Sequence, residues 1–149
     1  MTSSRPEARP ATRALREILT VSKEFEGHLG EQLAVNPTDL EAMEHLIASG
    51  PLAPAELARR LGITRPAVTA VVDRLAAVGH ASRSDNPADR RGVVVTASPT
   101  STARAMGILL PMIFDVDAVL DEFDPAEQDV IARYLELVLA AYRGHLPTP

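Results

Sequence analysis

The sequence contains no cysteine, and aromatic side chains make up only 3% of its 149 residues. The lack of cysteine excludes a disulfide framework, a thiolate metal site and a thiol-based redox switch. The longest apolar run, Ala105–Phe114, contains a proline and falls well short of the ~20 residues that cross a bilayer. The polar start of the chain lacks the apolar segment of a secretory signal. We therefore expect one cytoplasmic domain that has no membrane partner.

The residue patterns of an enzyme site are also missing. The sequence shows no glycine-rich phosphate loop, no nucleophile with a base near it and no cluster of metal ligands. The four histidines are scattered, and no two of them are three or four residues apart: His28, His45, His80 and His145. We predict that the protein is not an enzyme and that it carries no cofactor and no metal ion.

Charge is distributed unevenly along the chain. The net charge is −5, which by itself argues against a partner as acidic as a nucleic acid. The segment from Arg59 to Arg91, however, holds seven arginines against three aspartates, a net +4, which leaves −9 on the rest of the chain. A basic segment inside an acidic protein is typical of a site for an anionic partner, although a merely solvated face would give the same pattern.

Hydrophobic spacing and turn signals predict six helices and one hairpin. Thr38 with Glu41 forms a capping box at the start of the second helix, and Thr64 is the N-cap of the fourth. A tight turn at Gly62 joins the third and fourth helices into a helix-turn-helix. The hairpin has a loop of about eight residues around Asn86-Pro87. The predicted elements are helices over 11–32, 39–49, 54–61 and 65–78, strands over 80–83 and 92–97, and helices over 99–122 and 125–143.

A helix-turn-helix followed by a basic hairpin is the plan of a winged helix, a mainly helical fold with a small β-hairpin wing. In such folds the second helix of the motif lies in the major groove of DNA and presents its N-terminal residues to the base edges. Helical spacing turns a set of apolar residues inward: Val68, Val71, Val72 and Leu75. The outward set is then Arg65, Pro66, Thr69, Ala70 and Asp73.

The arginines of this region suit different parts of DNA. Arg65 can reach guanine or phosphate, while Arg74, near the helix end, is better placed for phosphate. Thr69 can bond a base or touch a thymine methyl group. The paired Arg90 and Arg91 lie at the tip of the wing, from which they can reach the adjacent minor groove or the backbone.

Two further residues of the hairpin belong to this prediction. Arg83, at the start of the hairpin, extends the basic surface. Asp89 makes little sense as a DNA contact, so we expect it to pair with a neighbouring arginine and to fix the shape of the loop.

The stretch "LARRLGITRPAVTAVVDRLAAVGHASRSDNPADRRGVVVTASP" resembles the MarR family of bacterial winged-helix transcriptional regulators. The most specific part is Asp89-Arg90-Arg91, at the right distance from the recognition-helix pattern over 68–75, and the likeness extends from about residue 11 to 146. Members often carry a basic or polar residue in place of Ala70, which leaves base specificity open. They often carry an apolar pair in place of His80-Ala81, which predicts a softer start to the wing.

The resemblance implies that Arg65, Thr69 and Arg74 contact DNA from the helix, and Arg90 or Arg91 from the wing. It also implies a homodimer that reads a near-palindromic operator in double-stranded DNA, most often as a repressor, and that is nucleoid-associated when bound. Residues 1–10 are then a flexible tail, 37–98 the DNA-binding lobe, and 11–36 with 99–146 the helical dimerisation region. The residues support the dimer independently, because the last two helices are apolar over more than one stripe.

The family commonly binds small phenolic or anionic molecules between the dimerisation helices and the DNA-binding lobe, which would alter DNA binding by linkage. Candidate lining residues, which suit a plain core equally well, are Phe25, His28, Met43 and Met112. A competing interpretation is a winged-helix protein-interaction module that binds DNA weakly and without sequence preference. An affinity for DNA that does not fall with salt would favour that alternative.

Overall fold

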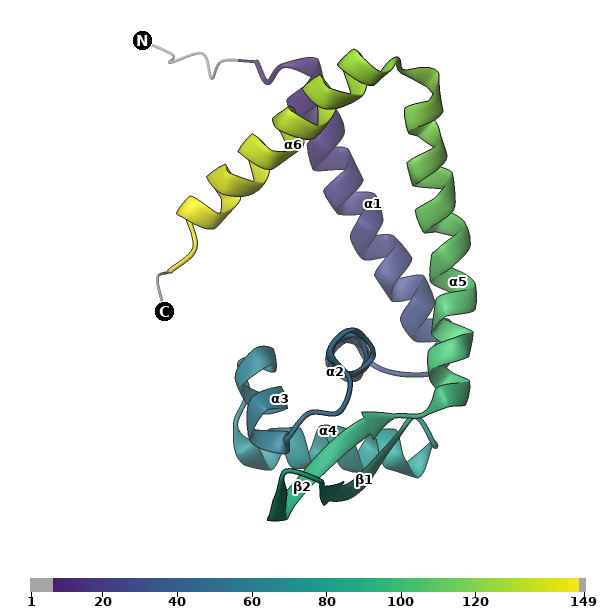
Figure 1. Ribbon diagram of the computed structural model, residues 1–149, viewed down its shortest axis with the longest axis vertical. Coiled ribbons are helices and arrows are strands. Elements are labelled where there is room, and N and C mark those ends of the chain that lie inside the picture. Colours follow the sequence, from purple (N-terminus) through teal and green to yellow (C-terminus); the bar gives the residue numbers. More distant parts are fainter. Residues whose placement is uncertain (1–6, 148–149) are drawn as a thin grey trace. The chain divides into compact units, whose positions relative to one another are not determined.

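The computed structural model describes residues 7–147 of the chain. Its elements follow the predicted order (Figure 1), with a short 3-10 helix added after the fifth α-helix. They are α1 (Pro10–Leu33), α2 (Pro37–Ser49), α3 (Pro54–Leu61), α4 (Arg65–Ala77), β1 (Ala81–Asn86), β2 (Asp89–Ala97), α5 (Pro99–Ala118), η1 (Val119–Glu122) and α6 (Pro125–Gly144). The chain divides into two units, residues 1–106 and 107–149. Residues 1–6 of the predicted tail lie outside the described part.

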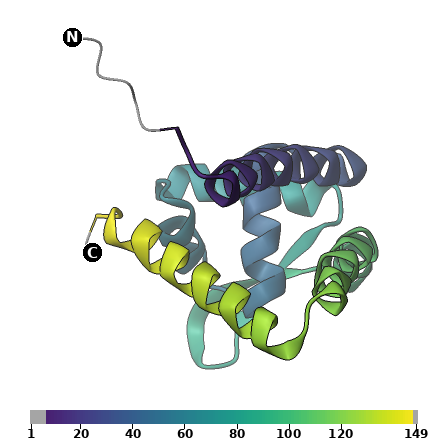
Figure 2. The same cartoon turned by 90° about the horizontal axis from the view of Figure 1, so that it is seen from above.

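The core of the first unit lies among the end of α1, helices α2 to α4 and the hairpin. α2 crosses α1 (Figure 2), and α4 lies beside the hairpin. Leu52 extends the hairpin by an isolated bridge, in which its N–H and C=O bond Val95 at 3.0 and 2.8 Å. The largest fully buried side chains come from all of these elements: Leu29, Leu33, Met43, Leu46, Leu57, Leu75, Val68, Val71, Val72 and Val95. The inward face predicted for the fourth helix is therefore confirmed.

The starts of two helices show how local signals compete. α4 begins after Thr64, whose side chain accepts from the N–H of Ala67, as predicted. The prediction for α2 was wrong, because the N-cap is Asn36 and not Thr38, and the Asn36 side chain accepts from the N–H of Asp39 at 2.8 Å. Pro37 decides the boundary, since a proline with its fixed φ and missing N–H fits the first helical position.

The hairpin is longer than predicted. Ser84 and Asp85, assigned to the loop, pair in register with Val94 and Val93, and only two residues separate the strands. The register shifts between Asp85 and Asn86, so the hairpin end is a bulge rather than an open loop. The exposed, polar strand ends gave no alternation by which the sequence could mark them.

The start of the wing is firmly held, contrary to the softer start predicted for His80-Ala81. Both residues are buried, and the Ala81–Ala97 pair opens the strand register. The His80 N–H donates to the C=O of Leu75 at 2.8 Å, which joins the wing to the end of α4.

In the second unit, Pro111 stands inside α5 without ending it, as predicted. α6 begins at the predicted place, where Asp124 and Glu127 form a capping box. None of residues 107–147 is buried, and large apolar side chains of α5, η1 and α6 are exposed: Ile113, Phe114, Val116, Val119, Val130, Leu135, Leu137 and Leu139. An isolated unit of this kind leaves an extended apolar surface in water. None of the helices within residues 7–147 is both long enough and apolar enough to cross a bilayer.

Candidate nucleic-acid interface

Helix α4 presents a small, exposed face opposite its buried valines. Arg65, Pro66, Thr69 and Ala70 are all exposed, and Arg65 is the first residue of the helix. The Thr69 hydroxyl donates to the C=O of Arg65 at 3.0 Å, which leaves its methyl group and its lone pairs for a ligand. Small side chains flank the long guanidinium, so a nucleic-acid groove could approach the helix closely.

Arg74 is held by a buried carboxylate from a distant part of the sequence. Its Nε and Nη2 atoms donate to Oδ2 and Oδ1 of Asp39 at 2.9 and 2.7 Å. The Asp39 side chain is only 5% exposed, whereas that of Arg74 is 50% exposed. The hydrogen bond to Asp39 raises the pKa of Arg74. Three of the five guanidinium N–H groups stay available to a phosphate while the pair persists.

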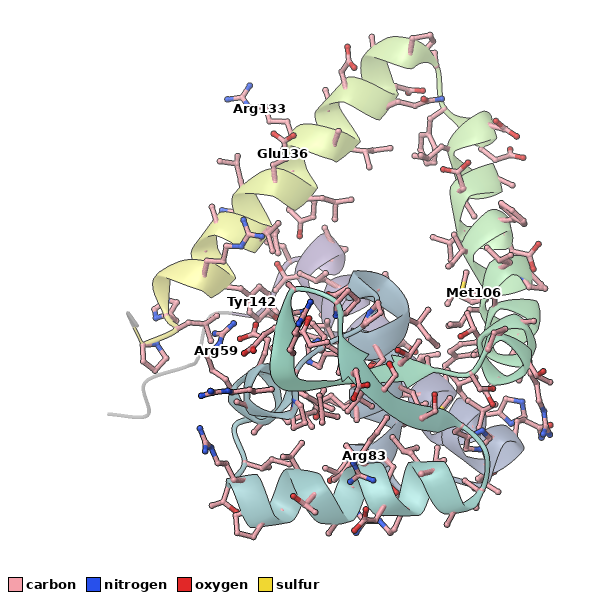
Figure 3. The ribbon with its side chains drawn as sticks, turned by 60° about the horizontal axis from the view of Figure 1, so that its bottom comes forward. Arg59, Arg83, Met106, Arg133, Glu136 and Tyr142 are labelled. Carbon is pink, nitrogen blue, oxygen red and sulfur yellow. The ribbon has the colours of Figure 1, made fainter. Side chains whose placement is uncertain are left out.

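Arg83 joins the wing to the recognition helix (Figure 3). Its Nη2 atom donates to Oδ1 of Asp73 at 2.7 Å, with a longer contact of 3.5 Å to the C=O of Thr69. Arg83 therefore fixes the hairpin against α4, and half of its charge effect is offset within the lobe. Sequence reasoning placed Asp73 on the outward face but missed this partner, because a count of charges does not tell which side chains meet.

Arg90 and Arg91 are exposed at the start of β2, beside the two-residue turn. Asp89 shapes this end in a way that was not predicted, since its Oδ1 accepts from the main-chain N–H of Arg91 at 3.0 Å. Among residues 7–147 its carboxylate belongs to none of the ion pairs. Asn86 acts similarly and accepts from the N–H of Ala88 at 3.0 Å. Two side chains thus fold the tip through main-chain bonds.

Two more arginines are paired on α3. Arg59 and Arg60 both donate to Glu56, at distances of 2.6 to 2.9 Å, and these bonds lower the pKa of Glu56 to about 2. Four of the seven arginines between 59 and 91 therefore form ion pairs: Arg59, Arg60, Arg74 and Arg83. Within the described residues, Arg65, Arg90 and Arg91 join none of them. These three carry the unneutralised positive charge of the lobe.

A cavity of about 640 Å³ lies between α1 and α2. Its polar lining is mostly acidic: Lys23, Glu26, Glu31, Glu41 and Glu44. Burial, with smaller effects of Glu26 and Glu41, raises the pKa of Glu44.

The predicted ligand residues do not line this cavity. Met43 is 1% exposed in the core of the lobe, Phe25 is half-buried and His28 is exposed. Met112 belongs to the second unit. In the part of the chain that the structure describes, no group of three or more histidine and carboxylate side chains could hold a metal ion.

Comparisons with known proteins agree with this geometry. The sequence model of the MarR family matches residues 35–92, which span α2 to the tip of the hairpin. The uncharacterized HTH-type transcriptional regulator YcgE of Bacillus subtilis is 28% identical over 84% of this chain and 81% of its own. The HTH-type transcriptional repressor YetL of the same species is 29% identical over 56% of this chain and 50% of its own.

A solved structure shows the same fold. An S. aureus MepR mutant bound to an oligodeoxyribonucleotide superposes with a TM-score of 0.63 at 15% identity, covering 91% of this chain and 99% of that one. The matched segment holds the helix-turn-helix and the paired arginines of the wing, and the relative YcgE extends the likeness over most of the chain. The chain therefore belongs to the MarR family of winged-helix, DNA-binding transcriptional regulators.

Proposed function

We propose that this regulator is a homodimeric repressor that binds a near-palindromic operator, with α4 of each copy in the major groove and the hairpin over the adjacent minor groove or backbone. Family membership carries the coarser statement, a DNA-binding regulator that is not an enzyme. The observation that supports the finer one is the exposed face of α4, where unpaired Arg65 lies in the same lobe as unpaired Arg90 and Arg91.

Each side chain of that face has a distinct role in the proposal. Arg65, at the N-terminus of the recognition helix, bonds a guanine edge, and Thr69 meets a base or a thymine methyl group. Pro66 and Ala70 allow close approach to the groove. Arg74 uses its remaining N–H groups on a phosphate while Asp39 keeps it in place.

The wing acts by charge and shape. Arg90 or Arg91 enters the minor groove, where a narrow groove concentrates negative potential. Arg83 keeps the wing against α4 through Asp73, so the two reading elements move as one body. Asp89 supports the tip through its bond to the Arg91 main chain.

The proposed dimer would cover apolar surface at both ends of the chain. In α1, Ile18 is 63% exposed and Val21 is 53% exposed. In α6, Val130 and Leu137 are 68% and 62% exposed. Side chains of this kind in a stable interface are removed from water, at about 25 cal/mol per Å² of apolar surface. Two recognition helices would then lie roughly 34 Å apart, one turn of DNA.

We also propose that a small effector alters DNA binding by favouring one state of the dimer. The charge of the cavity between α1 and α2 argues for the phenolic rather than the anionic class, since Glu26, Glu31, Glu41 and Glu44 would repel an anion. A phenol can donate its hydroxyl to a carboxylate and place its ring against Val35 and Leu40.

One observation favours the alternative of a protein-interaction module. Four of the seven arginines of the basic segment are already neutralised within the lobe, which leaves few charges for phosphates. A module of this kind would bind DNA weakly, at low salt only, and with no preferred sequence.

A selection from random double-stranded DNA, repeated at two salt concentrations, separates the two functions. Enrichment of a palindrome whose half-sites lie about one helical turn apart supports the dimeric regulator. Weak binding at low salt with no enriched sequence would support the interaction module. Repression is tested separately, by placing the selected site in a promoter and measuring transcription with and without the protein.

A further inference from the structure

His80 is a buried junction between segments that are distant in the sequence. The residue is 9% exposed. Its ring bonds the C=O of Leu33 through Nε2 at 2.8 Å and the Oγ of Ser101 through Nδ1 at 2.7 Å. Its main chain donates to Leu75 and accepts from the N–H of Ser98, both at 2.8 Å. One residue thus ties the end of α4 and the start of the wing to the last turn of α1 and the first turn of α5.

The partners fix the state of the imidazole. A carbonyl only accepts, so Nε2 carries the hydrogen that Leu33 receives. In the neutral ring Nδ1 then accepts from the hydroxyl of Ser101. The Ser101 Oγ in turn accepts from the Ser98 hydroxyl at 3.0 Å, and the Ser98 Oγ accepts from the Ser101 N–H at 3.1 Å. Every donor and acceptor of this chain has a partner, all with one direction.

The two ring bonds end on helix termini, where main-chain groups have no partner within the helix. Leu33 is the last residue of α1, and the next residue, Ala34, turns into the left-handed region at φ 55°. Ser98 and Ser101 form the first turn of α5, where Ser98 is the cap. A rigid ring between these termini, with two fixed nitrogen directions, restricts how α1 and α5 can turn relative to α4.

We propose that His80 is a positioning residue for DNA binding, whose neutral ring fixes the orientation of α4 and the wing relative to α1 and the first turn of α5. This inference rests on the proposed function for its consequence, because α1 and α5 are the helices through which the dimer would hold each lobe. A loose junction would let the two recognition helices meet half-sites at several spacings. A tight junction demands one spacing.

Three substitutions separate the two ring bonds. His80→Asn places an amide near the position of Nδ1, within reach of Ser101 but too short for Leu33. His80→Gln extends an amide N–H toward the position of Nε2 and the Leu33 carbonyl. His80→Phe keeps the volume of the ring and loses both bonds. His45→Gln, a half-buried histidine on α2, is the matched control.

The test is a distance distribution measured within one chain by pulsed electron paramagnetic resonance. The chain has no cysteine, so Ser22→Cys on α1 and Ala70→Cys on α4, both exposed sites, accept the spin labels alone. Labelled protein is diluted into an excess of unlabelled protein, which removes distances between copies. Neither DNA nor a dimer is required. We expect a narrow distribution for the parent and for His45→Gln, a broad one for His80→Phe and His80→Asn, and a narrow one again for His80→Gln.

The second readout is the affinity for the selected operator with its half-sites moved apart by one and two base pairs. Loss of the anchoring bonds should reduce the preference for the best spacing by about tenfold, with partial recovery in His80→Gln. If the parent selects no operator, the proposed function fails, while the distance widths still decide the role of His80.

Equal widths in all variants would overturn the proposal. A lower melting temperature with unchanged width and unchanged spacing preference would also overturn it, since His80 would then only stabilise the fold. If His80→Phe does not fold, the comparison of His80→Asn with His80→Gln, which differ by one methylene group, gives the answer.

Discussion

The salt dependence of DNA binding should follow the number of arginines that are free in the lobe. Arg65, Arg90 and Arg91 join no ion pair among residues 7–147, which gives six such arginines in a dimer. Each neutralised phosphate contributes about −0.9 to the slope of log K against log salt, so we expect a slope of about −5. Raising the salt from 50 to 200 mM should then weaken binding by about 10³.

Arg90→Ala removes two of these six charges from a dimer. The slope should fall to about −3.6, and the loss of affinity over the same salt range to about 10². Fluorescence anisotropy of a labelled operator at five salt concentrations measures both values. Arg59→Ala is the matched control, since Glu56 already holds that guanidinium and the slope should not change.

Two results would refute the reasoning. An equal fall of the slope in Arg90→Ala and Arg59→Ala would show that internal pairing does not decide which arginines bind phosphate. A slope near −9 for the parent would mean that Arg74 and Arg83 leave Asp39 and Asp73 on binding, since five arginines per copy would then engage.

Three further predictions concern stability and assembly. Asp39→Asn should lower the free energy of unfolding by about 1–2 kcal/mol, because a charge-assisted pair with half-exposed Arg74 is weakened; urea denaturation measures it, and an unchanged midpoint would mean that the pair adds nothing. A chain that ends before Pro125 should be monomeric in light scattering, and a persistent dimer would exclude α6 from the interface. Glu44→Gln should raise the melting temperature at pH 7 by the equivalent of no more than about 0.5 kcal/mol. Burial raises the pKa of Glu44, so the ionised form is disfavoured in the fold above that pKa, and the gain should vanish below pH 4, where folded and unfolded chains both hold the proton; a gain that persists there would contradict this cause.

Local patterns were sufficient for most of the fold. The apolar spacing of Val68, Val71, Val72 and Leu75 identified the buried face of α4, and Thr64 marked its start. At α2 two local signals competed, and Pro37 outweighed the capping box at Thr38. At the wing the polar strand ends around Ser84 and Asp85 carried no alternating pattern, so their pairing became visible only in the structure.

The candidate site was harder to predict because its details depend on distant contacts. Arg74 meets Asp39, which lies 35 residues earlier, and no local pattern links the two. His80 was expected to loosen the wing, since a histidine in place of an apolar residue looks unfavourable in a core. The carbonyl of Leu33 and the hydroxyl of Ser101 supply the partners that make its burial favourable, and only the fold brings them together.

The central claim is that α4 reads a base sequence through Arg65. The most direct test is a selection from random double-stranded DNA with the parent and with Arg65→Ala side by side. The account predicts an enriched palindrome for the parent and loss of the preference for guanine at one symmetric position for the variant, with the other positions kept. Identical preferences in both proteins, or no enrichment by the parent at either low or moderate salt, would contradict it.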